Sequence, residues 1–283
     1  MFQEEQKYSL SYTQHGPAQQ TDGVTNYYIP IYPVANHRLR RREKPVAVMY
    51  FLDSRGGVEY QSDPANDDNI PNWVSDRTAS WFSDIVASNK ARWGVLPSLA
   101  FVHIPIKAHD DAQRVANVSG PHYPGLNDDM PVAMQGYGNV GGNVYAGQDI
   151  PFMQALLNTE GLHSVYSGHD HGDSWCTLWS DTTNPHTPAS NGDLARDAYA
   201  SNGRPFLCFT KHSGFGGYGD WRRGVRQIEL RFDEQGGMSV QTWVRMQFRE
   251  EDDVAFPQVV TNVTLNGTYG EDVYRTVSGG YRP

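Results

Sequence analysis

The sequence predicts an α/β protein in which mixed β-sheet layers are flanked by helices. Continuous apolar runs over 46–52, 99–102 and 205–209 are typical of strands that are buried on both faces. A stretch with helical periodicity over 75–91 separates the first two runs. Apolar and polar residues then alternate over 225–232 and 238–248, which predicts an antiparallel hairpin. Strands that alternate with helices and end in a hairpin indicate a mixed sheet with helices outside it.

The first part of the chain is expected to hold two strands and one helix. The strands cover 24–32 and 45–52, and the second is apolar enough to be central in its sheet. The helix begins at Ser75 or Asp76, either of which can cap a helix N-terminus, and runs to about residue 91. Its buried face is formed by apolar residues at helical spacing: Ala79, Phe82, Ile85 and Val86.

A loop rich in Gly and Pro is expected over 107–147, before a second helix that Asp149 caps with Pro151 in its first turn. The stretch 179–204 has no periodicity, so we expect a loop that overhangs the functional pocket or lies inert on the surface. The tail, 249–283, is polar and is expected to be an edge strand or to lack regular structure. The chain therefore divides into one domain over 1–248 and this tail. The second helix buries three apolar residues: Phe152, Leu156 and Leu157.

Three histidines follow the ends of predicted strands. His103 comes directly after the run 99–102, and His169 and His171 lie in a Ser-Gly-His-Asp-His-Gly-Asp block after an apolar run that ends at 166. Because ligands collect at the carboxyl ends of parallel strands, we expect the three imidazoles to meet at one edge of the sheet. Neutral imidazoles are ligands that zinc, iron and manganese sites use. A lone His-x-His pair arises by chance, whereas this block with an upstream strand-end histidine is a stronger indication of a metal site.

Several motifs resemble those of one protein family. Phe-Val-His-Ile-Pro at 101–105 and Tyr-Ser-Gly-His-Asp-His-Gly-Asp-Ser-Trp-Cys at 166–176 resemble the last two motifs of the calcineurin-like metallophosphoesterases, which include the purple acid phosphatases. The glycine-rich block over 209–224 resembles that of a branch common in fungi, as do Ser-Leu-Ser-Tyr-Thr-Gln-His-Gly-Pro at 9–17 and Tyr-Phe-Leu-Asp-Ser at 50–54. The resemblance extends over roughly residues 8–248.

This resemblance implies two sheets packed face to face, with helices outside, around a site for two metal ions (Fe, Zn or Mn). His103 and His169 would bind one ion and His171 the other, and a metal-bound hydroxide would attack the phosphorus of a phosphate ester in line. Asp170 would orient a ligand imidazole by accepting its second N–H, or would face solvent. His212, in the glycine-rich block, would contact the substrate or serve as a structural turn histidine.

Other motifs of the family have no counterpart in the sequence. We find no Asp-x-His, no Gly-Asp-x-x-Asp and no Gly-Asn-His, which supply the remaining metal ligands and the catalytic histidine in the family. The chain thus resembles the C-terminal half of a phosphoesterase, an incomplete fold that leaves one apolar sheet face uncovered. By itself it would hold one metal ion or none, and no catalytic residue is assigned.

Two functions follow as alternatives. The first is a metal-dependent hydrolase, in a truncated or incomplete form, that acts on a small-molecule or protein phosphate ester. The second is a catalytically inactive secreted glycoprotein that retains a residual histidine cluster able to bind metal. The remaining histidines are not expected to be ligands: His15, His37, His109, His122, His163 and His186.

Charge and cysteine usage limit the partners and the compartment. A net charge of −9 argues against nucleic acid, which needs a basic surface, and the lack of a long apolar run argues against a membrane partner. Cys176 and Cys208 would form a disulfide if their strands are neighbours, or remain two buried thiols. Glycosylation sequons favour the secretory pathway, with an intracellular location as the alternative. The sequons lie at Asn117, Asn262 and Asn266.

Overall fold

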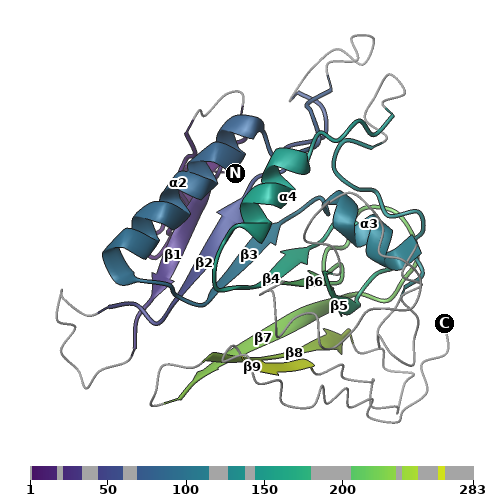
Figure 1. The fold of residues 1–283 in the computed structure, drawn as a ribbon. Coiled ribbons are helices and arrows are strands. Elements are labelled where there is room, and N and C mark those ends of the chain that lie inside the picture. The colour runs from purple at the N-terminus through teal and green to yellow at the C-terminus, as the bar shows by residue number, and fades with distance from the viewer. Residues whose placement is uncertain are drawn as a thin grey trace.

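The computed structural model contains a six-stranded sheet with helices on one side and a three-stranded sheet on the other (Figure 1). This arrangement confirms the predicted α/β class with mixed sheet layers flanked by helices. The strand order in the larger sheet is β1-β2-β3-β4-β6-β5. The structure describes residues 2–17, 22–33, 44–59, 69–114, 127–137, 144–179, 205–233, 238–247 and 261–264.

Four parallel strands form the centre of the larger sheet. They are β2 (Ala47–Leu52), β3 (Ser98–Val102), β4 (Leu162–Ser167) and β6 (Phe206–Phe209). The antiparallel strands β1 (Tyr27–Ile31) and β5 (Cys176–Leu178) lie at the two edges. Pro30 is tolerated because β1 is an edge strand. Since the four central strands run in one direction, their carboxyl ends share one edge of the sheet.

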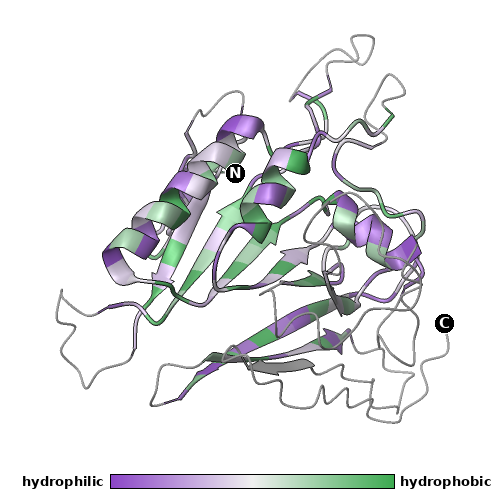
Figure 2. Cartoon of the chain, in the orientation of Figure 1, coloured by the Kyte–Doolittle hydropathy of each residue, from purple (hydrophilic) through white to green (hydrophobic). Residues whose placement is uncertain are grey.

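Two helices cover one face of this sheet. Helix α2 (Asp76–Trp93) begins as predicted at Ser75, whose side chain accepts a hydrogen bond from the backbone of Thr78. Helix α4 (Ile150–Leu157) begins after Asp149, but the Asp149 carboxylate makes no cap. It accepts instead from the backbone N–H of Lys107 and the hydroxyl of Tyr145. Figure 2 shows that the strands beneath these helices are largely apolar.

The second sheet packs on the other face, where its residues share one buried cluster with residues of β2, β3, β4, β5 and β6. It consists of β7 (Gly224–Phe232), β8 (Met238–Met246) and β9 (Thr261–Thr264), and the first two strands form the predicted hairpin. Met238 and Val240 are buried in one cluster with Tyr166 and Phe206. The antiparallel pairing of β9 with β8 places one segment of the polar 249–283 stretch in an edge strand.

A row of four aromatic rings crosses this same face along β1, β2, β3 and β4. The rings of Tyr27, Phe51, Phe101 and Tyr166 stack in sequence, with neighbouring centroids 4.8, 5.0 and 5.2 Å apart. Tyr166 is buried, whereas the other three rings are only half-buried. The second sheet therefore covers the β4 side of this face and leaves the β1 side partly open.

One expectation was wrong: the loop expected over 107–147 begins with a helix, α3 (Lys107–Arg114). Its buried residues are mostly polar, so its sequence lacks the apolar stripe from which helices are recognised. Ion pairs stabilise it instead, because Asp110 is bound by Lys107 at 3.0 Å and by Arg114 at 2.7 Å. Lys107 also makes a short contact with Asp111.

The described part of the chain contains no helix that is both long and apolar enough to span a lipid bilayer. Several predicted features lie outside the described residues, among them the 180–204 loop and two of the three sequons, at Asn117 and Asn266. The side chain of Asn262, the third sequon, is also outside the description. Three of the histidines that are not expected to be ligands also lie outside the described residues: His37, His122 and His186.

Candidate functional site

The ends of β3 and β4 bring two of the predicted histidines together. His103 follows β3 directly, and His169 lies in the turn that follows β4, the neighbouring parallel strand. The N–H of Gly168 donates to the carbonyl of His103 at 3.0 Å and ties the turn to the end of β3. A Cβ atom at Gly168 would lie only 3.3 Å from the His103 ring, so glycine permits this close approach.

The two rings face each other through nitrogen atoms. Nε2 of His103 lies 3.3 Å from Nδ1 of His169, and the ring planes are nearly perpendicular, at 85°. In neutral imidazoles one of these nitrogens carries the hydrogen and the other accepts it, according to the tautomers. His169 holds this position with a φ of 70°, in the left-handed region.

The surroundings of both rings favour the neutral state. Desolvation by the surrounding protein lowers the pKa of His103 although the residue is exposed at the surface, the proximity of His171 lowers it further, and Asp53 acts in the opposite direction. Burial, followed by the charges of His103 and His171, lowers the pKa of His169 to about 4. Neutral imidazoles have lone pairs available to a metal ion, because the proton that would compete has already left.

The structure places His171 apart from this pair. Its ring is stacked between His212, with centroids 4.7 Å apart, and Tyr218, with centroids 4.4 Å apart. Its Nδ1 lies 2.7 Å from the carbonyl oxygen of Tyr218. Of the three predicted ligands, His103 and His169 therefore meet, whereas His171 belongs to a second cluster beside them.

The glycine-rich block holds His171 in this second cluster. A Cβ atom at Gly217 would come within 2.2 Å of Cε1 of His171, so the backbone lies directly against the ring. Trp221 packs in the same way on Gly172 and Gly219, where added Cβ atoms would come within 2.7 and 2.2 Å of its ring. The block that contains His171 and the glycine-rich block are thus two interlocked loops, which explains why both need glycines.

Two buried ionisable residues, Lys211 and Asp170, hold the histidine loop through hydrogen bonds to backbone groups. Lys211 is 5% exposed, and its amine donates to the carbonyl of His171 at 2.6 Å, while burial lowers its pKa to about 8. Asp170 is 2% exposed and accepts from the backbone N–H of Ala133 at 2.8 Å, while burial raises its pKa to about 7. Asp170 therefore anchors residues 127–137 to the histidine loop, and its role in orienting an imidazole stays a prediction.

His212 lies at the edge of the same cluster. Its Nδ1 is 3.1 Å from the carbonyl of His171, and its ring is partly exposed. This position next to His171 agrees with either of the roles expected for His212, and contact with a substrate stays a prediction.

Sequence reasoning missed two residues of the site, Tyr218 and Asp129. The Tyr218 hydroxyl makes a short hydrogen bond to the Asp129 carboxylate and accepts from the backbone N–H of His171 at 3.2 Å. Tyr218 could have been noticed in the sequence, because it is an aromatic residue between two glycines of the glycine-rich block, Gly217 and Gly219. Asp129 has none, because it lies in a segment without periodicity and reaches the site only through the fold.

The described residues fit a pair of metal ligands but not a complete metal site. Metal–nitrogen bonds of 2.0–2.1 Å at a tetrahedral angle place two nitrogens about 3.3 Å apart, which is the separation between His103 and His169. In the part of the chain that the structure describes, no group of three or more His, Cys, Asp or Glu side chains is arranged to hold an ion. A two-metal centre is therefore not formed by these residues.

The fold and the histidine pair define an α/β protein with imidazoles at the carboxyl edge of a mixed sheet. In sequence, the chain is 25% identical over 241 residues to a protein of Arabidopsis thaliana named "Probable inactive purple acid phosphatase 29". The match covers 80% of this chain and 50% of that protein, so the chain spans about half the length of this curated relative. The similarity supports the metallophosphoesterase superfamily and leaves the branch open. No protein-family model and no solved structure matches the chain.

Proposed function

We propose that this chain supplies the histidine ligands of a metal-dependent phosphoester hydrolase of the purple acid phosphatase kind. The observation that carries the proposal is the 3.3 Å separation between Nε2 of His103 and Nδ1 of His169 at the carboxyl ends of adjacent parallel strands. This is the separation expected for two imidazoles on one tetrahedral ion. The distant similarity to a protein named as a probable inactive purple acid phosphatase supports the same superfamily but not catalytic activity.

The histidine pair can accept an ion without losing a proton to solvent. One facing nitrogen carries a hydrogen in the metal-free protein, and that hydrogen can move to the other nitrogen of the same ring. Both facing lone pairs then point towards one ion. The pKa of His103 is lowered and that of His169 is lowered to about 4, so the His169 ring is available to a metal ion at mildly acidic pH and protonation of His103 is disfavoured.

A bound ion would supply the Lewis-acid chemistry that activates water and polarises a phosphate ester. The roles of this chain are to present the two imidazoles, to hold His171 and His212 beside them, and to keep the loops rigid through Lys211 and Asp170. In this proposal His212 would contact the substrate, and the substrate would be a phosphate ester of a small molecule or protein. A second ion, if it binds, would need His171 to leave its stack.

The secretory pathway is the compartment that we propose. Cys176 and Cys208 lie opposite each other on β5 and β6 and form a disulfide, with Cα atoms 4.1 Å apart. Structural disulfides persist mainly in oxidising compartments, which supports secretion over an intracellular location.

Metal titration tests the proposal. Calorimetric titration with Zn²⁺ and Mn²⁺ is expected to give one ion per chain, and binding should be lost in His103→Ala and in His169→Ala. The matched control is His15→Ala, a histidine whose Nδ1 lies 2.8 Å from the carbonyl of Val24 and which is not one of the proposed ligands, so its removal should leave metal binding unchanged. Phosphate, followed by ³¹P NMR, should bind only when the metal is present.

The opposite result would favour the alternative function. If no metal binds, or if metal binding is the same without His103 and His169, the pair is a structural contact. The chain would then be better described as a non-catalytic protein, and the hydrolase proposal would fall.

A further inference from the structure

A small pocket lies within the glycine-rich block, in the connection from β6 to β7. Its volume is about 180 Å³, which suits one small chemical group rather than a whole cofactor. The N–H of Gly224 donates to the carbonyl of His212 at 2.9 Å, so the loop over 212–224 closes on itself. The N–H of Gln247, which follows β8, donates to the carbonyl of Arg223 at 2.7 Å. These two hydrogen bonds fix the end of the loop at which Arg223 enters the pocket wall.

The Arg223 guanidinium group is held in place but is not neutralised. Its central carbon lies 4.5 Å from the centroid of the Phe215 ring, and its Nε donates to the carbonyl of Gly214 at 2.8 Å. Among the described residues, no carboxylate forms an ion pair with Arg223. The N–H groups of its terminal nitrogens can therefore bind an anion through two parallel hydrogen bonds.

The charges around the pocket favour an anion with a single charge. Among the described residues that line it, Arg222 and Arg223 bring two positive charges and Asp220 brings one negative charge. His212 also lines the pocket and is neutral at pH 7.5, above the ordinary histidine pKa of about 6.5. One positive charge is left to be balanced. A carboxylate supplies one negative charge and matches the planar guanidinium group, whereas a phosphate monoester carries nearly two charges at this pH.

Exposed aromatic rings adjoin the charged groups. Phe215 is 80% exposed and Tyr218 is 48% exposed, and both line the pocket. Covering the Phe215 ring with the apolar part of a ligand would remove apolar surface from water, which is favourable. The pocket therefore suits a molecule that has an apolar body next to its carboxylate.

We propose that this pocket binds the carboxylate group of a small monoanionic molecule whose apolar body packs on Phe215. The terminal N–H groups of Arg223 donate to the two carboxylate oxygens. The site is separate from the histidine pair and does not depend on the hydrolase function proposed above.

Four probes test the ligand class. We would titrate phenylacetate, phenylacetamide, acetate and phenyl phosphate into the ¹⁵N-labelled, metal-free chain at pH 7.5 and follow the Nε–H resonance of Arg223. Phenylacetate should bind about tenfold more tightly than neutral phenylacetamide, because only its carboxylate forms charge-assisted hydrogen bonds. It should also bind more tightly than acetate, which cannot cover Phe215, and than phenyl phosphate, which carries excess charge. Phenylacetate binding that is no tighter than that of phenylacetamide or acetate, or tighter binding of phenyl phosphate, would overturn the proposal.

Two variants link the binding to the pocket. Arg223→Gln should reduce the affinity for phenylacetate to that for phenylacetamide, and Phe215→Ala should reduce it to that for acetate. Because Phe215 is exposed, the second variant tests the pocket even if the loop changes in Arg223→Gln. The amide spectrum shows whether each variant is folded. Unchanged phenylacetate binding in either variant would contradict the assignment.

The matched control is Arg92→Gln. Arg92 also lies over an aromatic ring, with its central carbon 4.8 Å from the centroid of Trp93, but it belongs to α2 and does not line the pocket. This variant should bind phenylacetate normally, and a loss equal to that in Arg223→Gln would contradict the assignment. His103→Ala should also bind phenylacetate normally, so a failure here is separate from a failure of the metal proposal.

Discussion

Single glycines determine where the histidine rings lie. A Cβ atom at Gly168 would fit only tightly, at 3.3 Å from the His103 ring, and a Cβ atom at Gly217 would clash with the His171 ring at 2.2 Å. Glycine at 217 is needed twice over, because its φ of 95° is also in the left-handed region. The block over 167–173, which resembles a metal-binding motif in the sequence, therefore also contains residues that are needed for packing against the glycine-rich block.

Gly217→Ala is expected to displace the His171 ring and to lower the free energy of unfolding by about 1–3 kcal/mol, through strain at positive φ and a clash with Cε1. The His171 ring resonances in ¹H–¹³C NMR spectra and urea unfolding measure the two effects. Gly216→Ala is the matched control, since a Cβ atom there meets nothing within 4 Å. Similar effects of the two variants would show that the ring contact has no special importance.

His163 links folding to pH. It is buried in β4, stacked on Phe206, and its Nε2 has no partner among the described residues. Burial lowers its pKa to about 3 from the ordinary 6.5. The folded state thus favours the neutral ring, so its contribution to stability is complete above pH 6.5 and is lost as the pH falls from there towards 3.

His163→Phe should therefore shift the midpoint of acid unfolding to lower pH, because no buried ring must then be protonated. Tryptophan fluorescence between pH 7 and pH 3 measures the midpoint. The control is His15→Phe, at a ring that lies partly exposed and away from the core. A midpoint that does not move in His163→Phe would mean that another group controls acid unfolding.

At the scale of elements, the apolar pattern predicted the strands well and the polar helix poorly. The strands β2, β3 and β6 contain continuous apolar runs, which are recognisable because a parallel sheet is buried on both faces. Strand β4 is equally buried but carries His163 and Ser164 among its apolar residues. Helix α3 was missed because its buried side carries charges that pair only once the chain has folded. The disulfide was left open by the sequence for a similar reason, since it depends on the pairing of β5 with β6.

Asp110→Asn tests whether ion pairs stabilise α3. Asp110 is 3% exposed and bound by Lys107 and Arg114, so removal of its charge should lower the free energy of unfolding by about 2 kcal/mol. Urea denaturation gives this value. Glu4→Gln, which breaks the exposed pair with Lys7, is the control and should change stability by less than about 1 kcal/mol. Equal losses would indicate that burial adds nothing to the α3 pairs.

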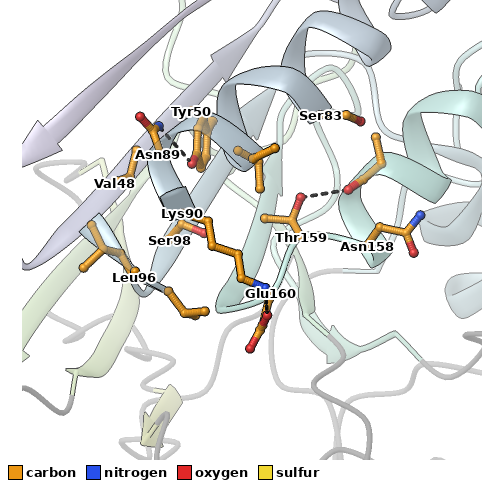
Figure 3. A pocket seen from close by; sticks show the side chains of 15 residues that line it. Val48, Tyr50, Ser83, Asn89, Lys90, Leu96, Ser98, Asn158, Thr159 and Glu160 are labelled. Carbon is orange, nitrogen blue, oxygen red and sulfur yellow. Dashed lines mark hydrogen bonds and ion pairs between the residues drawn. The ribbon is translucent and has the colours of Figure 1, made fainter. Parts of the chain in front are cut away.

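At the scale of the whole molecule, the two ends of the parallel strands differ in what they carry. The carboxyl ends of the parallel strands carry the histidine pair, and their amino ends form a cavity beside Ser98 (Figure 3). The sequence motifs predicted that His103 and His169 would meet, because both follow strands that are neighbours in the sheet. They could not predict that His171 stacks between His212 and Tyr218, since this depends on how the glycine-rich block folds back.

The 283-residue chain is expected to hydrolyse p-nitrophenyl phosphate at or near the background rate when loaded with Zn²⁺, Mn²⁺ or Fe³⁺. Two neutral imidazoles bring no negative charge to balance an ion, and the described residues form no group of three or more ligands. An ion held in this way binds weakly and has no second ion beside it to stabilise the leaving oxygen. Release of p-nitrophenolate, compared between the wild-type chain and His103→Ala, measures the activity. Fast hydrolysis that disappears in His103→Ala would instead mean that the chain completes a working metal centre with ligands beyond the histidine pair.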